Sequence, residues 1–201
     1  ACARMPRPDD PSFPQQWNLD MLRVPEAWST NTGVASTVIA FLDSGVALTH
    51  PDLSPRLATY GWNFVDNSTN VADDQGHGTH VAGIIAAAGD NGTGVAGLDW
   101  DATIMPLKVL DARGDGSTDK AISAVYFAVD NGAKVINASW GGDVFSQAML
   151  DALNYANAHG VVFVTAAGND GANNDATTSY PASYRLPNVL AVASVDRAGN
   201  L

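Results

Sequence analysis

Short apolar runs alternate with helical patterns along most of this chain, and that alternation constrains its fold more than any other feature. The runs have the length of strands and cover residues 38–42, 104–110, 134–138, 161–166 and 189–195. Patterns typical of helices occur at residues 79–88, 119–131 and 147–158. Strands that read as nearly continuous apolar runs are buried on both faces. The sequence therefore predicts an α/β fold in three layers, a parallel sheet with helices on both faces.

The first 33 residues differ from the rest, because they are polar and rich in proline. Regular structure is interrupted there by Pro6, Pro8, Pro11, Pro14 and Pro25. We interpret residues 1–33 as an N-terminal arm that wraps the domain and ends in a short helix near residues 24–30. Residues 34–201 contain no linker or repeat, and we expect them to belong to one domain.

Charge and cysteine content exclude several classes of protein. A net charge of −11 argues against nucleic acid as a partner, because phosphate binding needs clustered lysine and arginine. No run approaches the roughly 18 apolar residues of a membrane span. Cys2 is the only cysteine, which excludes an intrachain disulfide and a zinc site built from thiolates. The opening Ala1-Cys2-Ala3 is compatible with the remnant of a bacterial lipoprotein signal.

Three polar side chains occur where the predicted elements reach one edge of the sheet. Asp43 follows the first predicted strand, Asn169 follows the fourth, and His77 lies just before the first predicted helix. Each has a structural alternative, since Asp and Asn are common turn residues and His77 with His80 resembles a metal-binding pair. In parallel sheets, however, ligands bind beyond the carboxyl ends of the strands. A carboxylate, an imidazole and an amide donor at that edge are what a Ser-His-Asp hydrolase requires besides its serine.

Four ordered segments of the chain resemble the subtilases, the peptidase S8 family of serine proteases. They are Leu42-Asp43-Ser44-Gly45, Gly76-His77-Gly78-Thr79-His80, Ser139-Trp140-Gly141-Gly142 and Ala166-Ala167-Gly168-Asn169. The resemblance implies a subtilisin-like serine endopeptidase, which hydrolyses peptide bonds with an Asp-His-Ser triad. It implies that Asp43 orients His77, that His77 is the general base and then the general acid, and that Asn169 donates to the oxyanion. By family habit, we expect a secreted protein, with a cell-surface lipoprotein as a variant of that hypothesis.

The resemblance also implies where a protein or peptide substrate binds. The substrate would lie extended between two segments, Gly114-Asp115-Gly116 and Ser139-Trp140-Gly141, and would form main-chain hydrogen bonds with them. The segment Ala166-Ala167-Gly168 would form the other wall of the pocket for the residue before the cleaved bond. Thr118 replaces the aromatic residue that relatives often carry at a neighbouring subsite, and we expect that subsite to be more open.

Calcium is the cofactor that the resemblance implies. The matching ligands are the side chains of Asp10, Asp52 and Asn91 and the carbonyl groups of Ala88, Thr93 and Val95. Six oxygen ligands suit Ca²⁺, and such a site would hold the N-terminal arm on the domain. The alternative is that Asp10 and Asp52 are ordinary loop residues.

The most consequential departure from the family pattern is that no segment matches the motif Gly-Thr-Ser-x-Ala-x-Pro, which carries the nucleophile. The most similar string, Thr178-Ser179-Tyr180-Pro181-Ala182, lacks the glycine. We therefore expect the fold to be incomplete without a C-terminal Ser-bearing segment of the same protease, bound as a second chain after a nick. Two alternatives stay open: the chain is part of a longer protease, or it is a serine-less pseudoprotease that binds peptides.

Overall fold

The structure is a computed structural model that describes residues 6–201. The hypothesis about Ala1-Cys2-Ala3 and the beginning of the predicted arm lie outside the described residues. Within residues 6–201, no helix is long and apolar enough to cross a membrane.

A six-stranded, entirely parallel sheet forms the centre of the molecule, with the strand order β2-β3-β1-β4-β5-β6. The strands are β1 (Val38–Asp43), β2 (Trp62–Asn63), β3 (Thr103–Lys108), β4 (Val135–Ala138), β5 (Val162–Ala166) and β6 (Val189–Val192). The predicted α/β fold with a parallel sheet is confirmed. Strand β2 was not predicted, because two residues are too short to show an apolar period.

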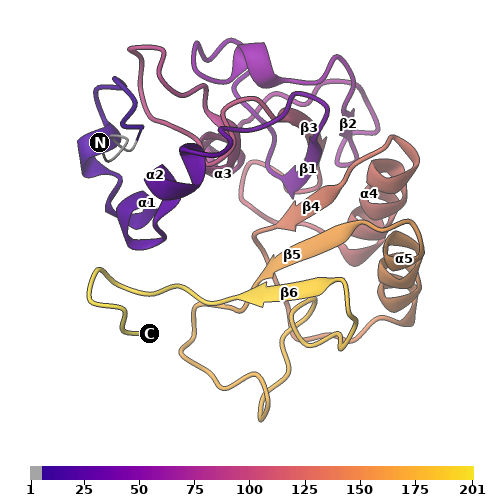
Figure 1. Ribbon diagram of the computed structural model, residues 1–201. Coiled ribbons are helices and arrows are strands. Elements are labelled where there is room, and N and C mark those ends of the chain that lie inside the picture. The colour runs from indigo at the N-terminus through magenta and orange to yellow at the C-terminus, as the bar shows by residue number, and fades with distance from the viewer. Residues whose placement is uncertain (1–5) are drawn as a thin grey trace.

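Helices cover both faces of the sheet, as the alternating pattern predicts (Figure 1). Helices α4 (Thr118–Asp130) and α5 (Gln147–Ala158) pack against each other and against one face. Helix α3 (His77–Ala86) packs on the other face, against β1 and β3. It begins two residues before the predicted helix, so His77 occupies its first position.

Strand β1 shows how its sequence serves both layers. Ala40 and Leu42 belong to the apolar core under α4 and α5, whereas Phe41 belongs to the core under α3. All three side chains are fully buried. Successive side chains of a strand point to opposite faces, so both faces of this central strand are apolar up to Asp43, the polar residue that ends it.

The N-terminal arm forms short helical segments and a small core of its own. The segments are η1 (Phe13–Gln15), α1 (Trp17–Met21) and α2 (Val24–Trp28), and a further 3-10 turn, η2 (Ser54–Arg56), follows β1. Phe13 and Trp28 pack with Trp100 of the main domain, and the Gln16 side chain forms two hydrogen bonds with the main chain of Ala96. The arm is therefore held against the domain, while the proposed boundary between residues 33 and 34 stays a prediction.

One part of the sheet keeps apolar surface in solvent. Phe163 of β5 is buried against the α4–α5 layer, and the strand period turns Val164 toward the opposite face. Val164 is in register with Leu190 of the edge strand β6, and Ala166 is in register with Val192. Leu190 and Val192 are 53% and 54% exposed. This face of β5 and β6, which we call the open face, is thus apolar and only partly covered.

We expect Ile136→Ala to lower the free energy of unfolding by about 2–5 kcal/mol, because the substitution opens a cavity in the core. Ile136 lies in β4 and is fully buried. The matched control is Leu22→Ala, at a side chain that is 70% exposed, for which a change within about 0.5 kcal/mol is expected. Denaturant unfolding measures both values, and equal losses would contradict this description of the core.

Candidate active site

Asp43 and His77 form a hydrogen-bonded pair at the carboxyl edge of the sheet. Asp43 is the last residue of β1 and is fully buried, and His77 is the first residue of α3, with a side chain that is 42% exposed. The His77 Nδ1 atom lies 2.7 Å from Asp43 Oδ1. An ionised carboxylate only accepts hydrogen bonds, so Nδ1 carries the proton and Nε2 can accept one. A buried acid that orients a partly exposed base suits general base catalysis.

The close approach of α3 to β1 depends on a glycine. A Cβ atom at Gly78 would overlap the carbonyl oxygen of Gly45, and it would also crowd the Ser44 hydroxyl. The first turn of α3 can therefore lie directly on the residues that follow Asp43. This contact explains why glycine follows His77 in the sequence.

Asn169 lies at the same edge of the sheet, but the structure does not bring it into contact with the pair. It follows β5 and is exposed, and within residues 6–201 its side chain has no hydrogen-bond partner. Strands β1 and β5 are separated by β4, so their ends are roughly 10 Å apart, twice the usual strand spacing. The segment Ser139–Trp140 follows β4 and lies between the two.

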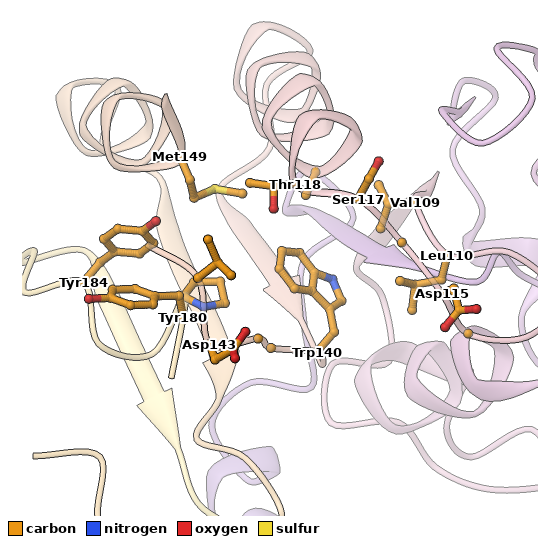
Figure 2. A pocket seen from close by; sticks show the side chains of 17 residues that line it. Val109, Leu110, Asp115, Ser117, Thr118, Trp140, Asp143, Met149, Tyr180 and Tyr184 are labelled. Atoms are coloured by element: carbon orange, nitrogen blue, oxygen red, sulfur yellow. The ribbon is translucent and has the colours of Figure 1, made fainter. Parts of the chain in front are cut away.

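A cavity of about 370 Å³ opens beside this edge (Figure 2). Loop residues 114–118 and segment 140–144 line opposite sides, and Tyr180 and Tyr184 close one end. The predicted substrate-binding residues that line it are Gly114, Asp115, Gly116, Trp140 and Gly141. The cavity does not include the predicted residues Ser139, Ala166, Ala167 and Gly168, which lie at or just beyond the ends of β4 and β5.

Hydrogen bonds fix both sides of the cavity. The Trp140 indole Nε1 donates to the carbonyl oxygen of Leu42 at 2.8 Å, which ties the cavity to the residue before Asp43. On the other side, the Asp111 carboxylate accepts main-chain hydrogen bonds from Arg113 and Asp115. These bonds hold the pKa of the Asp111 carboxyl below its usual range.

Sequence reasoning missed several residues of the cavity wall, among them Asp143, Met149 and Tyr184. Met149 lies on α5, and its position has the apolar spacing of an ordinary core residue. The Tyr184 hydroxyl exchanges hydrogen bonds with the main chain of Ser146. No local pattern marks these side chains, because the wall forms only when segments far apart in sequence pack together.

Comparison with known proteins agrees with the observed fold. A sequence model of the subtilase family matches residues 35–201. The chain belongs to this family. It is 41% identical to thermitase of Thermoactinomyces vulgaris over 194 residues, which are 96% of this chain and 67% of thermitase.

Two further relatives match this chain over a smaller share of their own length. The chain is 43% identical to a thermophilic serine proteinase of Bacillus sp. strain AK1, over 87% of this chain and 42% of that protein. It is 47% identical to the cell wall-associated protease of Bacillus subtilis, over 80% of this chain and 17% of that protein. The resemblance found in the sequence is confirmed, and the chain spans only part of these relatives.

Sequence reasoning also missed a buried lysine that lies next to Asp43 in the sheet. Lys108 ends β3 beside Asp43 and is almost fully buried. Its Nζ atom donates to the carbonyl oxygens of Ser44 (2.6 Å) and Leu110 (2.9 Å) and to Asp74 Oδ1 (2.6 Å). A single lysine within the apolar run 104–110 was the available signal, because such a charge is buried only where partners compensate it.

The predicted calcium ligands come together at the base of the arm. Asp10 and Asp52 are both buried, and both accept hydrogen bonds from loop residues 88–95. Asp10 Oδ1 is buried without a hydrogen-bond partner within residues 6–201. An orphaned carboxylate oxygen of this kind fits a hard cation such as Ca²⁺.

The rest of this donor set is less complete. Asn91 turns its amide nitrogen toward Asp52 Oδ1 at 2.9 Å, and its oxygen accepts from the main chain of Thr93. The amide must therefore turn over before Asn91 can ligate a cation. Residues 6–201 contain no group of three or more His, Cys, Asp or Glu side chains placed to hold a metal. Any cation here would thus depend on carbonyl oxygens as well as carboxylates.

Lys108→Met tests the support behind the pair. We expect it to lower the free energy of unfolding by about 1–3 kcal/mol, because two buried carbonyl oxygens lose their donor while the aliphatic volume is kept. Asp74 is half exposed and regains water. The control Lys134→Met changes an exposed lysine and is expected to stay within about 0.5 kcal/mol. Thermal unfolding measures the stability of both variants. A Lys108→Met variant as stable as the control would contradict the stabilising role of the Lys108 hydrogen bonds.

Proposed function

We propose that this protein is a serine endopeptidase whose active site this chain supplies in part. The observation that carries this proposal is the 2.7 Å hydrogen bond between His77 Nδ1 and the buried Asp43 carboxylate. The pair lies at the same edge of the sheet as the cavity of about 370 Å³, although neither residue lines that cavity. Asn169 supplies the side-chain donor for the oxyanion. The serine comes from a C-terminal Ser-bearing segment of the same protease.

The reaction follows from the geometry of the pair. The His77 Nε2 atom takes the proton of the serine hydroxyl as its oxygen attacks the peptide carbonyl. Asp43 stabilises the imidazolium that forms, and the Asn169 amide donates to the tetrahedral oxyanion. His77 then gives the proton to the leaving amine. Water then attacks the acyl carbon and gives a proton to His77, which passes that proton to the serine oxygen as the ester bond breaks and the acid product leaves.

Two observations support a Ser-bearing segment as a partner. The relatives extend well beyond the part that this chain matches. The open face presents Leu190 and Val192 to solvent, and burying apolar side chains of this size favours association. The serine-less peptide-binding alternative uses the cavity but has no need of a hydrogen-bonded acid and base. The Asp43–His77 pair therefore favours the peptidase.

The cavity supports an extended peptide as substrate. Its walls combine the aromatic side chains of Trp140, Tyr180 and Tyr184 with the small side chains of Thr118 and Ala121. Such a pocket has room for one large side chain of the peptide. The segments 139–141 and 166–168 are proposed to bind the residue before the cleaved bond.

Calcium and secretion complete the proposal. Asp10, Asp52 and Asn91 would hold Ca²⁺ together with the carbonyl groups of Ala88, Thr93 and Val95, which would neutralise the buried carboxylates and fasten the arm. Secretion is supported by the names of two relatives, a cell wall-associated protease and a minor extracellular protease, both of Bacillus subtilis.

Peptide hydrolysis by the protein with its Ser-bearing segment tests the proposed roles. We expect His77→Ala to abolish hydrolysis and labelling by a covalent serine-hydrolase probe, because the serine loses its base. Asn169→Ala should lower kcat by about 10²–10³, the loss that removing one such donor causes in subtilisin. Asn131→Ala, at the exposed end of α4, is the control and should leave kcat unchanged. Hydrolysis that survives His77→Ala would overturn the triad, and a wild-type protein that binds peptides without labelling would support the pseudoprotease.

Calcium removal tests the proposed cofactor. Because a ligand that binds only the folded state stabilises it by about 2.7 kcal/mol at 100 times its Kd, Ca²⁺ should raise the Tm of the wild type. Asp10→Asn should remove most of that increase, whereas Asp151→Asn, on the exposed side of α5, should keep it. Differential scanning calorimetry with Ca²⁺ and with a chelator measures the shift. Equal Tm values in both conditions would contradict a calcium site.

A further inference from the structure

We propose that Asp73 is a positioning residue for the Asp43–His77 pair, holding the first turn of α3 against the residues that follow β1. Its effect on hydrolysis rests on the proposed function, whereas its effect on the geometry of the pair does not. Asp73 lies in the loop before α3 and does not contact either member of the pair through its own side chain.

Asp73 collects five hydrogen bonds, all donated to its carboxylate. Its Oδ1 atom accepts from the Ser44 hydroxyl (2.8 Å) and from the main-chain N–H groups of Gln75 (3.0 Å) and Gly76 (2.9 Å). Its Oδ2 atom accepts from the main-chain N–H (2.9 Å) and the hydroxyl of Thr79. One donor residue, Ser44, directly follows Asp43, and the others lie within two residues of His77 in the sequence.

Further bonds close the connection between the two segments. The Ser44 hydroxyl oxygen accepts the main-chain N–H of Gly78 at 2.9 Å, and the Thr79 hydroxyl accepts that of Ala47 at 2.9 Å. The main-chain N–H of Asp73 donates to the carbonyl of Val46. The residue after Asp43, Ser44, is thus hydrogen-bonded to the residue after His77, Gly78. We call this connection between the two segments the joint, and Asp73 binds to both of its sides.

The joint requires a carboxylate rather than another polar side chain. An aspartate offers two acceptor oxygens and no donor, which matches five donors. In Asp73→Asn, one of the two oxygens becomes an amide nitrogen that faces N–H and O–H donors. Whichever way the amide turns, at least one main-chain N–H loses its acceptor and one hydroxyl must accept from the amide instead of donating to it. The substitution preserves the shape of the side chain and removes only this capacity.

The electrostatics agree with this arrangement. Partial burial opposes ionisation of Asp73, but hydrogen bonds from Thr79, Gly76 and Gln75 outweigh it and hold the pKa of the carboxyl well below its usual range. A depressed folded-state pKa contributes stability above the unfolded value of about 4, and this contribution is lost as the pH falls through the folded value. At neutral pH, Asp73 is therefore fully charged and its hydrogen bonds to both segments are intact.

Kinetics of the protein with its Ser-bearing segment provide the first test. Asp73→Asn should lower kcat by roughly 10- to 100-fold, because small displacements of reacting groups cost this much, and should leave KM within about twofold. Asp196→Asn is the matched control, since Asp196 also anchors a turn through main-chain bonds and has a lowered pKa, but lies after β6. An Asp73→Asn variant with the kcat of wild type would overturn the proposal, as would equal kcat losses in both variants.

Nuclear magnetic resonance tests the geometry without relying on hydrolysis. A short hydrogen bond between a histidine Nδ1–H and a carboxylate gives a proton signal far downfield, and His77→Ala identifies it in the wild type. We expect the signal to be lost or to exchange much faster with water in Asp73→Asn and to persist in Asp196→Asn. If Asp73→Asn does not fold, Ser44→Ala, which removes one bond to Asp73 and the acceptor of Gly78, gives the same comparison. If the signal is unchanged in the folded variant, the positioning role is overturned, even if the wild type hydrolyses no peptide. If the signal is lost in the variant and the wild type hydrolyses no peptide, only the proposed function is rejected.

Discussion

The structure depends on one buried charge, the carboxylate of Asp43 at the end of the central strand β1. A carboxylate without partners is very costly to remove from water, so the fold must bring donors to it. The Ser44 main-chain N–H and the His77 ring both bond to Asp43 Oδ1, at 2.8 and 2.7 Å, while Oδ2 is buried without a hydrogen-bond partner within residues 6–201. The glycine at position 78 and the lysine at position 108 follow from the same need, since one permits the approach of α3 and the other holds the Ser44 carbonyl.

The parallel sheet turns this local requirement into a site. Because every strand ends at the same edge, the residues after β1, β4 and β5 meet there although they are far apart in sequence. The Trp140 indole makes the link explicit, since it lines the cavity and donates to the carbonyl of Leu42. The acid that orients His77 and the wall that would hold a peptide are thereby fixed to consecutive residues of one strand.

The sequence could predict the features that a local pattern encodes. Buried strands such as β1 and helices such as α5 have clear periods, and Asp43 and His77 stand at element ends where polar residues signal function. Features that depend on contacts between distant segments are harder to predict from the sequence. Strand β2 is too short for a period, and the acceptor role of Asp73 depends on donors from two distant segments. Asn169 and the calcium ligands rest on resemblance to the subtilases, because their spacing alone fits ordinary turns.

The hydrogen bonds around Asp43 also bear on how such a site can be completed. In the proposed peptidase, the acid, the base and their connection through Ser44 all belong to this chain, where their hydrogen bonds form without the Ser-bearing segment. Asn169 follows β5, and β4 lies between β5 and the strand β1 that carries Asp43. A segment that covers the open face over Leu190 would gain free energy from apolar burial. In the proposed peptidase, burial of this apolar surface would drive association of the segment. The Asp43–His77 hydrogen bond is already formed in this chain without it.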